Sequence, residues 1–181
     1  MDECVFCEIV AGRAPASLVY ADDKVTAFAD HRPVTPCHLL IIPNEHFVLL
    51  ADLPDGLAEH ILRVGMRLAA AIRSSGMPCE GINLFVADGK AAGQEVFHHH
   101  LHVIPRWARD GFVITASAWS LPRPTRHNLD GNAAVIRAAL NGGSRARNQV
   151  GTTRIRADHV GDCGDFEPGL GACCRSFVAA R

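Results

Sequence analysis

The sequence predicts an α+β fold with a sheet of about five strands, one long helix and a short helix near the N-terminus. Apolar runs of strand length recur between residues 18 and 104, separated by turn residues. Residues 52–76 instead repeat their apolar side chains at helical spacing. The chain has 181 residues, which is long enough to bury one sizeable core.

The sequence changes character after Gly142. Residues 143–181 are rich in glycine and arginine, sparsely apolar and without a clear period. Such a segment buries too little apolar surface to offset the entropy lost on folding. We therefore expect one folded domain over residues 1–142 and a loosely ordered C-terminal extension over residues 143–181.

Composition narrows the class of protein. Hydrophobic residues make up 48% of the chain and charged residues 20%, as in soluble globular proteins. The formal net charge of −1 leaves no basic excess for non-specific binding to nucleic acid. No apolar run reaches the roughly 18 residues that span a bilayer, and the acidic start is unlike a signal peptide. We expect a cytoplasmic protein whose seven cysteines are thiols or metal ligands rather than a disulfide framework.

The first half of the chain contains a short helix and three strands. Residues 6–11 have apolar side chains at helical spacing and are followed by Gly12. Residues 18–20 and 25–29 are strand-like, and the turn residues between them predict a β-hairpin. Residues 39–43 form a continuous apolar run ending at a proline, which predicts a central strand buried on both faces.

The long helix follows. Asp52 and Pro54 mark its start and Gly76 its end. Its apolar stripe consists of Leu57, Ile61, Val64, Leu68 and Ile72. Residues 82–86 are the next strand, and residues 88–93 form a loop of small residues. Further on, the pattern predicts a short strand over residues 112–119 and a short helix that ends at Gly142.

The segment from Gln94 to Arg106 holds four of the ten histidines. Its apolar residues predict a β-strand that Pro105 stops. Alternate side chains of a strand share a face, so His98, His100 and His102 would lie on one side, roughly 7 Å apart. An expression tag does not explain them, because Leu101 interrupts the run. Three aligned imidazoles can be a nucleophile with two helpers, a metal site, or structural histidines.

Residues 98–104 resemble the signature of the histidine triad (HIT) family, His-x-His-x-His followed by two apolar residues. The flanking residues 92–94 and 105–106 match as well, and the resemblance runs from about Cys4 to about Leu140. His99 departs from it, since the family has an apolar residue there. The resemblance implies an antiparallel sheet, a homodimer, and cleavage at the α-phosphate of nucleoside phosphoramidates or dinucleoside polyphosphates.

The resemblance also assigns roles to residues. His100 would be the nucleophile that forms a covalent nucleotidyl-histidine, His102 would donate to the phosphate oxygens, and His38 would support them. Asp30 would accept hydrogen bonds from the ribose, although it can also simply start a turn. The purine nucleotide site would consist of Asp30, Phe6, Ile9, Gln94 and His102. Ala87 and Glu95 depart from relatives that carry Asn and Ser in this loop.

Cys4 and Cys7 form a C-x-x-C pair whose spacing alone is compatible with a redox motif, half of a zinc site, or chance. A zinc-carrying subset of HIT proteins binds the metal with such a pair, and the resemblance implies Cys4, Cys7, His46 and His98 as zinc ligands. A zinc-bound His98 is not free as an acid, so protonation of the leaving group would fall to another group.

Two other functions remain open from the sequence. A catalytically idle, nucleotide-binding dimer would keep Asp30 and the small-residue loop without a working nucleophile. A metallohydrolase would place His98, His100 and His102 on one ion. On a straight strand these side chains diverge too far to reach one metal at about 2.1 Å.

Overall fold

The computed structural model describes residues 4–112 and 124–146. The chain divides into two compact units, residues 1–119 and 120–181, which are described separately. The strand predicted over residues 112–119 and most of the predicted extension lie outside the described residues. The division of the chain at residue 142 stays a prediction.

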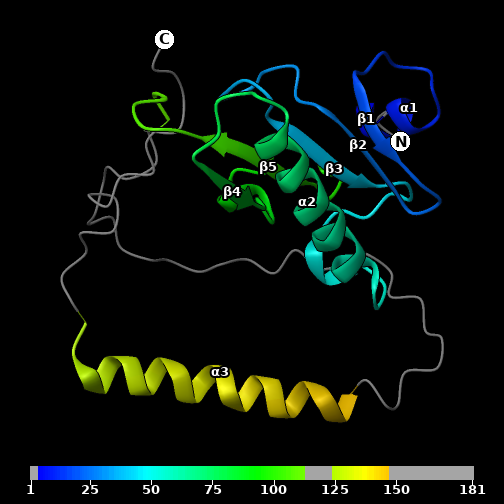
Figure 1. The fold of residues 1–181 in the computed structure, drawn as a ribbon. Coiled ribbons are helices and arrows are strands. Elements are labelled where there is room, and N and C mark those ends of the chain that lie inside the picture. The colour runs from blue at the N-terminus through cyan, green and yellow to red at the C-terminus, as the bar shows by residue number, and fades with distance from the viewer. Residues whose placement is uncertain (1–3, 113–123, 147–181) are drawn as a thin grey trace, which may run out of the picture. The chain divides into compact units, whose positions relative to one another are not determined.

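The first unit is a five-stranded antiparallel sheet with strand order β1-β2-β3-β5-β4 (Figure 1). This arrangement confirms the α+β prediction and the antiparallel sheet. Its strands are β1 (Leu18–Ala21), β2 (Val25–Ala29), β3 (Leu39–Pro43), β4 (Gly81–Phe85) and β5 (Leu101–Arg106). Strand β5, which begins directly after His100, therefore lies between β3 and β4.

The predicted hairpin of β1 and β2 is present, and Asp22 holds its turn. The Asp22 Oδ1 atom accepts hydrogen bonds from the backbone N–H groups of Lys24 and Val25 at 2.9 and 2.8 Å. The Tyr20 hydroxyl donates to Oδ2 at 2.6 Å, and Nε2 of His60 lies 2.8 Å from the same oxygen. Since His60 belongs to the long helix, the carboxylate ties that helix to the hairpin.

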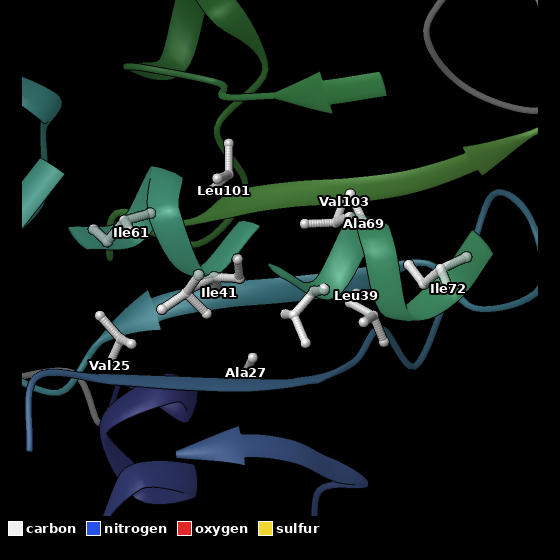
Figure 2. Packing of buried hydrophobic residues seen from close by; sticks show 11 residues of the cluster. Val25, Ala27, Leu39, Ile41, Ile61, Ala69, Ile72, Leu101 and Val103 are labelled. Atoms are coloured by element: carbon white, nitrogen blue, oxygen red, sulfur yellow. The ribbon is translucent and has the colours of Figure 1, made fainter. Parts of the chain in front are cut away.

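Strand β3 is central and buried on both faces, as predicted. Ile41 and Ile42 point to opposite faces and are both 0% exposed. One face carries the main core under the long helix, which includes Ile41, Leu101 and Val103 (Figure 2). The other face packs Phe6, Phe28, Leu40 and Ile42 together. The histidine site lies on this second face.

Helix α2 (Leu57–Ser74) covers the first face, after a short 3₁₀ turn, η1 (Leu50–Asp52). The predicted stripe residues Ile61, Val64, Leu68 and Ile72 are all buried. A Cβ atom at Gly65 would lie 3.1 Å from Cδ2 of Leu101. The glycine therefore lets α2 approach β5 more closely than a larger residue would.

Strand β5 differs from the prediction at both ends. It begins only at Leu101, and it continues through Pro105 to Arg106. Before Leu101, the chain leaves the ladder, and the His99 N–H donates to the Phe47 carbonyl oxygen at 2.6 Å. Pro105 is tolerated because the pairing with β3 ends at Val103, so its missing N–H breaks no bond there. The prediction that Pro105 stops the strand is wrong.

The two remaining helices are α1 (Val5–Val10) and α3 (Arg126–Ala146). Helix α1 lies within one residue of its predicted bounds at either end. Helix α3 is longer than predicted, because it runs past Gly142 for four further residues. Within residues 4–112 and 124–146, the structure holds no helix whose length and apolar character would allow it to cross a membrane.

Candidate active site

His100 lies directly before β5 and is 6% exposed. Its Nδ1 atom is 2.8 Å from the carbonyl oxygen of His98. A carbonyl oxygen only accepts hydrogen bonds, so the proton of the neutral ring sits on Nδ1 and the lone pair remains on Nε2. Burial lowers the pKa of His100, although the hydrogen bond to His98 and the charges of Asp30 and Glu95 oppose that lowering. The ring is therefore neutral near pH 7, in the form that a nucleophile needs.

His102 lies beside His100, with the ring centroids 4.8 Å apart. Its Nδ1 atom is 2.9 Å from Nε2 of His38. The Val34 N–H donates to Nδ1 of His38 at 3.4 Å, which leaves the His38 proton on Nε2, facing His102. His102 then carries its own proton on Nε2, as a donor for an incoming oxygen. Burial, followed by the neighbouring His100 and His38, lowers the pKa of His102 to about 4.

Asp30 follows β2 and is close to His38, with its Oδ2 atom 3.5 Å from Nδ1 of that ring. Its Oδ1 atom accepts a hydrogen bond from the Arg32 N–H at 2.8 Å, so Asp30 does start a turn. Cys37 has a φ of 65°, in the left-handed region that favours glycine. The backbone before His38 therefore has a conformation that residues with a side chain rarely adopt.

Helix α1 places an apolar wall next to the histidines. Phe6 is 6% exposed, and its ring lies edge-on to those of His98 and His100, with centroids 5.8 and 5.4 Å apart. Ile9 packs in the same cluster, with Phe28. Two of the predicted nucleotide-binding residues thus lie beside the histidines.

Gln94 is 4% exposed and braces the loop before the histidines. Its Oε1 atom accepts a hydrogen bond from the Gly89 N–H at 2.8 Å, and its Nε2 atom donates to the Val48 carbonyl oxygen at 2.9 Å. One amide proton remains for any phosphate oxygen. The structure therefore gives Gln94 a bracing role that the sequence did not predict.

Cys4 and Cys7, at the start of α1, lie close to His46 and His98. Sγ of Cys4 and Sγ of Cys7 lie 3.4 and 3.6 Å from Nδ1 of His98, and Sγ of Cys7 lies 3.3 Å from Nδ1 of His46. All four candidate ligand atoms fall within 4.8 Å of one another. A tetrahedral zinc ion with usual bond lengths separates sulfur and nitrogen ligands by about 3.5 Å. The cluster is therefore compatible with zinc in both composition and spacing.

His98 has the tautomer that a metal ligand needs. Its Nε2 atom lies 2.9 Å from the Pro43 carbonyl oxygen, so it carries the proton and leaves the lone pair of Nδ1 facing the thiols. Burial lowers the pKa of His98 to about 4. Both ring nitrogens are engaged, so His98 is not available as an acid. Since Nδ1 of His98 faces the thiols, the three histidines do not surround one ion, which counts against the metallohydrolase.

Sequence reasoning missed two parts of this site. The Pro43 and His98 carbonyl oxygens orient His98 and His100. Every residue has a backbone oxygen, so the residue type does not indicate which one binds a histidine. Arg32 pairs with Glu95, with Nη2 and Oε2 2.5 Å apart, across 63 positions of sequence. The Arg32–Glu95 pair could have been suspected from the sequence, because each of these opposite charges stands in a loop close to a candidate site residue.

Known proteins resemble much of this chain in sequence. A model of the HIT domain matches residues 11–109, which is more than half of the chain. An uncharacterised HIT-like protein of Mycobacterium tuberculosis is 42% identical over 137 residues, 76% of this chain and 92% of that protein. The adenylylsulfatase HINT3 of Arabidopsis thaliana is 35% identical over 129 residues, 71% of this chain and 61% of that protein.

A solved structure resembles the chain in fold and in sequence. It is the crystal structure of a zinc-bound histidine triad family protein from Mycobacterium smegmatis, with a TM-score of 0.60 and 40% identity. The similarity covers 80% of this chain and 97% of that protein.

Proposed function

The chain belongs to the histidine triad (HIT) family, and from this premise we propose that it is a nucleotide hydrolase or transferase acting through a covalent nucleotidyl-His100 intermediate. Hydrolysis of nucleotides is the general activity of the family, and the adenylylsulfatase among the relatives is consistent with it. The proposed substrates are nucleoside phosphoramidates or dinucleoside polyphosphates, cleaved at the α-phosphate.

One observation carries the proposal: the hydrogen bond of 2.8 Å between Nδ1 of His100 and the His98 carbonyl oxygen. It keeps the proton on Nδ1 and leaves Nε2 as the attacking atom. A neutral imidazole is a competent nucleophile at pH 7. A catalytically idle binding module would need no such tautomer, so this observation favours the enzyme.

In the first step, Nε2 of His100 would form a bond to the α-phosphorus while the bond from phosphorus to the leaving group breaks, its electron pair going to the leaving group. His102 would donate its Nε2 proton in a hydrogen bond to a phosphate oxygen, where charge develops. In the second step, water would form a bond to the phosphorus while the phosphorus–nitrogen bond breaks, its electron pair returning to Nε2 of His100 and the proton of water passing to solvent. Because both ring nitrogens of His98 are engaged, the leaving group would take its proton from another group or from its own surroundings.

The nucleotide would be held between α1 and the loop after β2. Asp30 would accept hydrogen bonds from the ribose hydroxyls, and the purine base would pack against Phe6 and Ile9. Gln94 would offer its remaining amide proton to the phosphate. The buried apolar environment of Phe6 supports this arrangement, because an aromatic base gains from contact with such a surface.

We also propose that Cys4, Cys7, His46 and His98 hold a structural zinc ion. The spacing of the ligand atoms and the zinc-bound Mycobacterium smegmatis relative support this site. When bound, the metal would stabilise both sulfurs as thiolates. The four residues would then fix α1, and with it Phe6, against the segment that carries His100.

The remaining parts of the proposal concern the context of the enzyme. We propose a homodimer, a HIT domain over residues 1–142 with a C-terminal extension, and a cytoplasmic location. The cysteines of the described residues form no disulfide with one another, as is usual for cytoplasmic proteins: Cys4, Cys7, Cys37 and Cys79.

The test is intact-mass spectrometry during turnover of adenosine phosphoramidate, under conditions that preserve acid-sensitive adducts. We expect an adenylyl adduct on the wild type and none on His100→Ala, whose turnover should fall by at least about a thousandfold because the nucleophile is gone. His127→Ala, which removes an exposed histidine of α3, is the matched control and should keep the adduct.

Turnover that survives in His100→Ala would refute the assignment of the nucleophile. Binding of the nucleotide without adduct or turnover of either phosphoramidate or diadenosine tetraphosphate would instead identify the protein as a binding module.

A further inference from the structure

An ion pair joins the two loops beside the proposed nucleophile. Nη2 of Arg32 lies 2.5 Å from Oε2 of Glu95, and both side chains are mostly exposed, at 69% and 72%. Arg32 belongs to the turn after β2, and Glu95 to the loop before β5. The pair therefore connects the proposed ribose-binding residue Asp30 with the segment that leads to His100.

Hydrogen bonds and packing hold the backbone near both Arg32 and Glu95. The Arg32 N–H is bound to Asp30 Oδ1 at 2.8 Å. Glu95 follows Gln94, whose amide is held on both sides, and precedes Val96, which packs against the cluster of Phe6. Only the charged ends of Arg32 and Glu95 are therefore free to respond to a bound molecule.

The ion pair is connected to the triad through Asp30. The backbone of Arg32 is bound to Asp30, whose Oδ2 atom lies 3.5 Å from Nδ1 of His38. Nε2 of His38 in turn lies 2.9 Å from Nδ1 of His102. A leaving group has to depart toward solvent, and the exposed charges of Arg32 and Glu95 would meet it there.

We propose that the Arg32–Glu95 ion pair sets the preference of the enzyme for its leaving group, and that the intact pair favours the amines of nucleoside phosphoramidates over anions. This inference rests on the proposed function. Because Glu95 engages the guanidinium of Arg32, an anionic leaving group finds no free cation there and meets a carboxylate. A cationic amine meets the same carboxylate as an attraction.

The pair predicts opposite effects for its two members. Glu95→Gln releases Arg32 and should shift the ratio of the two kcat/KM values toward the anionic leaving group. Arg32→Gln exposes the charge of Glu95 and should shift the ratio toward the amine. Each shift should be roughly 1.5- to fivefold, the size expected for one solvent-exposed charge. The double variant should return toward the wild-type ratio.

The experiment compares two adenosine substrates that differ in leaving-group charge: the phosphoramidate of AMP with the lysine side chain, and adenosine 5′-phosphosulfate. The kcat/KM values are measured at low and high salt for the wild type, both single variants and the double variant. Glu59→Gln and Arg63→Gln are the matched controls, because they remove exposed charges of α2. The shifts should shrink at high salt, as those of exposed charges do.

The outcomes separate this inference from the proposed function. Wild-type turnover of both substrates, with a ratio that the single variants leave unchanged or shift in one common direction, would overturn the leaving-group inference alone. Shifts of the same size in the α2 controls would overturn it too. Turnover of neither substrate by the wild type would overturn this inference, and turnover of diadenosine tetraphosphate would then decide whether the proposed function stands.

Discussion

At the scale of single residues, backbone oxygens orient two of the buried histidines, His98 and His100. The His98 carbonyl oxygen sets the tautomer of His100, and the Pro43 carbonyl oxygen sets that of His98. A backbone oxygen stays in place when a side chain is substituted. The tautomer of the nucleophile therefore depends on the path of the chain before β5 rather than on the identity of one neighbour.

The lowered pKa values lead to a prediction for pH dependence. The attacking nitrogen is lost when His100 is protonated, and burial moves that protonation below the ordinary histidine value of 6.5. We expect kcat/KM for adenosine phosphoramidate to stay level as the pH falls through 6.5 and to decline only below it. A profile of kcat/KM from about pH 4 to pH 8 measures the decline.

As a control, circular dichroism over the same pH range shows whether the protein stays folded. A decline that begins at or above pH 6.5 while the protein stays folded would contradict the neutral, buried His100.

The residue types of the site could be predicted from the sequence better than the hydrogen bonds and ion pairs that hold them. Alternating histidines and a C-x-x-C pair are visible as residue types, and the structure brings them together near α1. The Pro43 carbonyl oxygen and the pairing of Arg32 with Glu95 were not predictable in the same way. The role of the Pro43 carbonyl oxygen cannot be recognised from a residue type. The Arg32–Glu95 pair depends on the path of two loops that are far apart in the sequence.

At the scale of elements, periodicity predicted interiors better than ends. The stripe of α2 and the run of β3 were correct because burial on a core face fixes them. The predicted ends of β5 were wrong, because the end of a strand depends on how far its neighbouring strands pair with it. Pairing with β3 covers only Leu101 to Val103, and pairing with β4 carries the strand on through Pro105.

The proposed metal site makes helix α1 and the nucleophile one structural unit, which can be tested through its ligands. The double variant Cys4→Ser and Cys7→Ser should lose its zinc, from about one ion per chain to almost none, since hydroxyls replace two of four ligands. Without that link, Phe6 should no longer hold its place against His100, and adduct formation should slow by about ten- to hundredfold. Elemental analysis and intact mass report the two effects.

Cys79→Ser is the matched control, because Cys79 lies outside the cluster, with its Sγ atom 3.3 Å from the Gly81 carbonyl oxygen. A full zinc content in the double variant would refute the proposed ligands. Loss of zinc with an unchanged rate of adduct formation would show that α1 holds its place without the metal.

At the scale of the whole molecule, the edge of the sheet at β4 offers a surface for a second copy. Leu84 of this edge strand is 40% exposed, and it lies next to Gly65 of α2. On that helix, Leu62 and Met66 flank the glycine and are 49% and 64% exposed. An open strand edge beside exposed apolar side chains is a usual site of association.

If the chain forms the proposed homodimer through this surface, Met66→Glu and Leu84→Glu should dissociate it, because each would bury a charge at the interface. Light scattering after gel filtration should give the mass of one chain for the variants and of two for the wild type. Val19→Glu changes an exposed residue of β1 at the opposite edge and is the matched control. A dimer that Val19→Glu dissociates and the β4 variants do not would place the interface at the other edge.

Only some of the histidines that are close in the sequence are close in space. The rings of His38, His102 and His100 follow one another, with centroids 5.1 and 4.8 Å apart, while His98 faces the cysteines. The motif therefore contributes to two separate groups: a trio of rings completed by a histidine that precedes β3, and the Cys–His cluster that holds α1. In a descendant that lost Cys4, Cys7, His46 and the imidazole of His98 together, the trio would survive, provided that packing alone held α1 and the carbonyl oxygen in place.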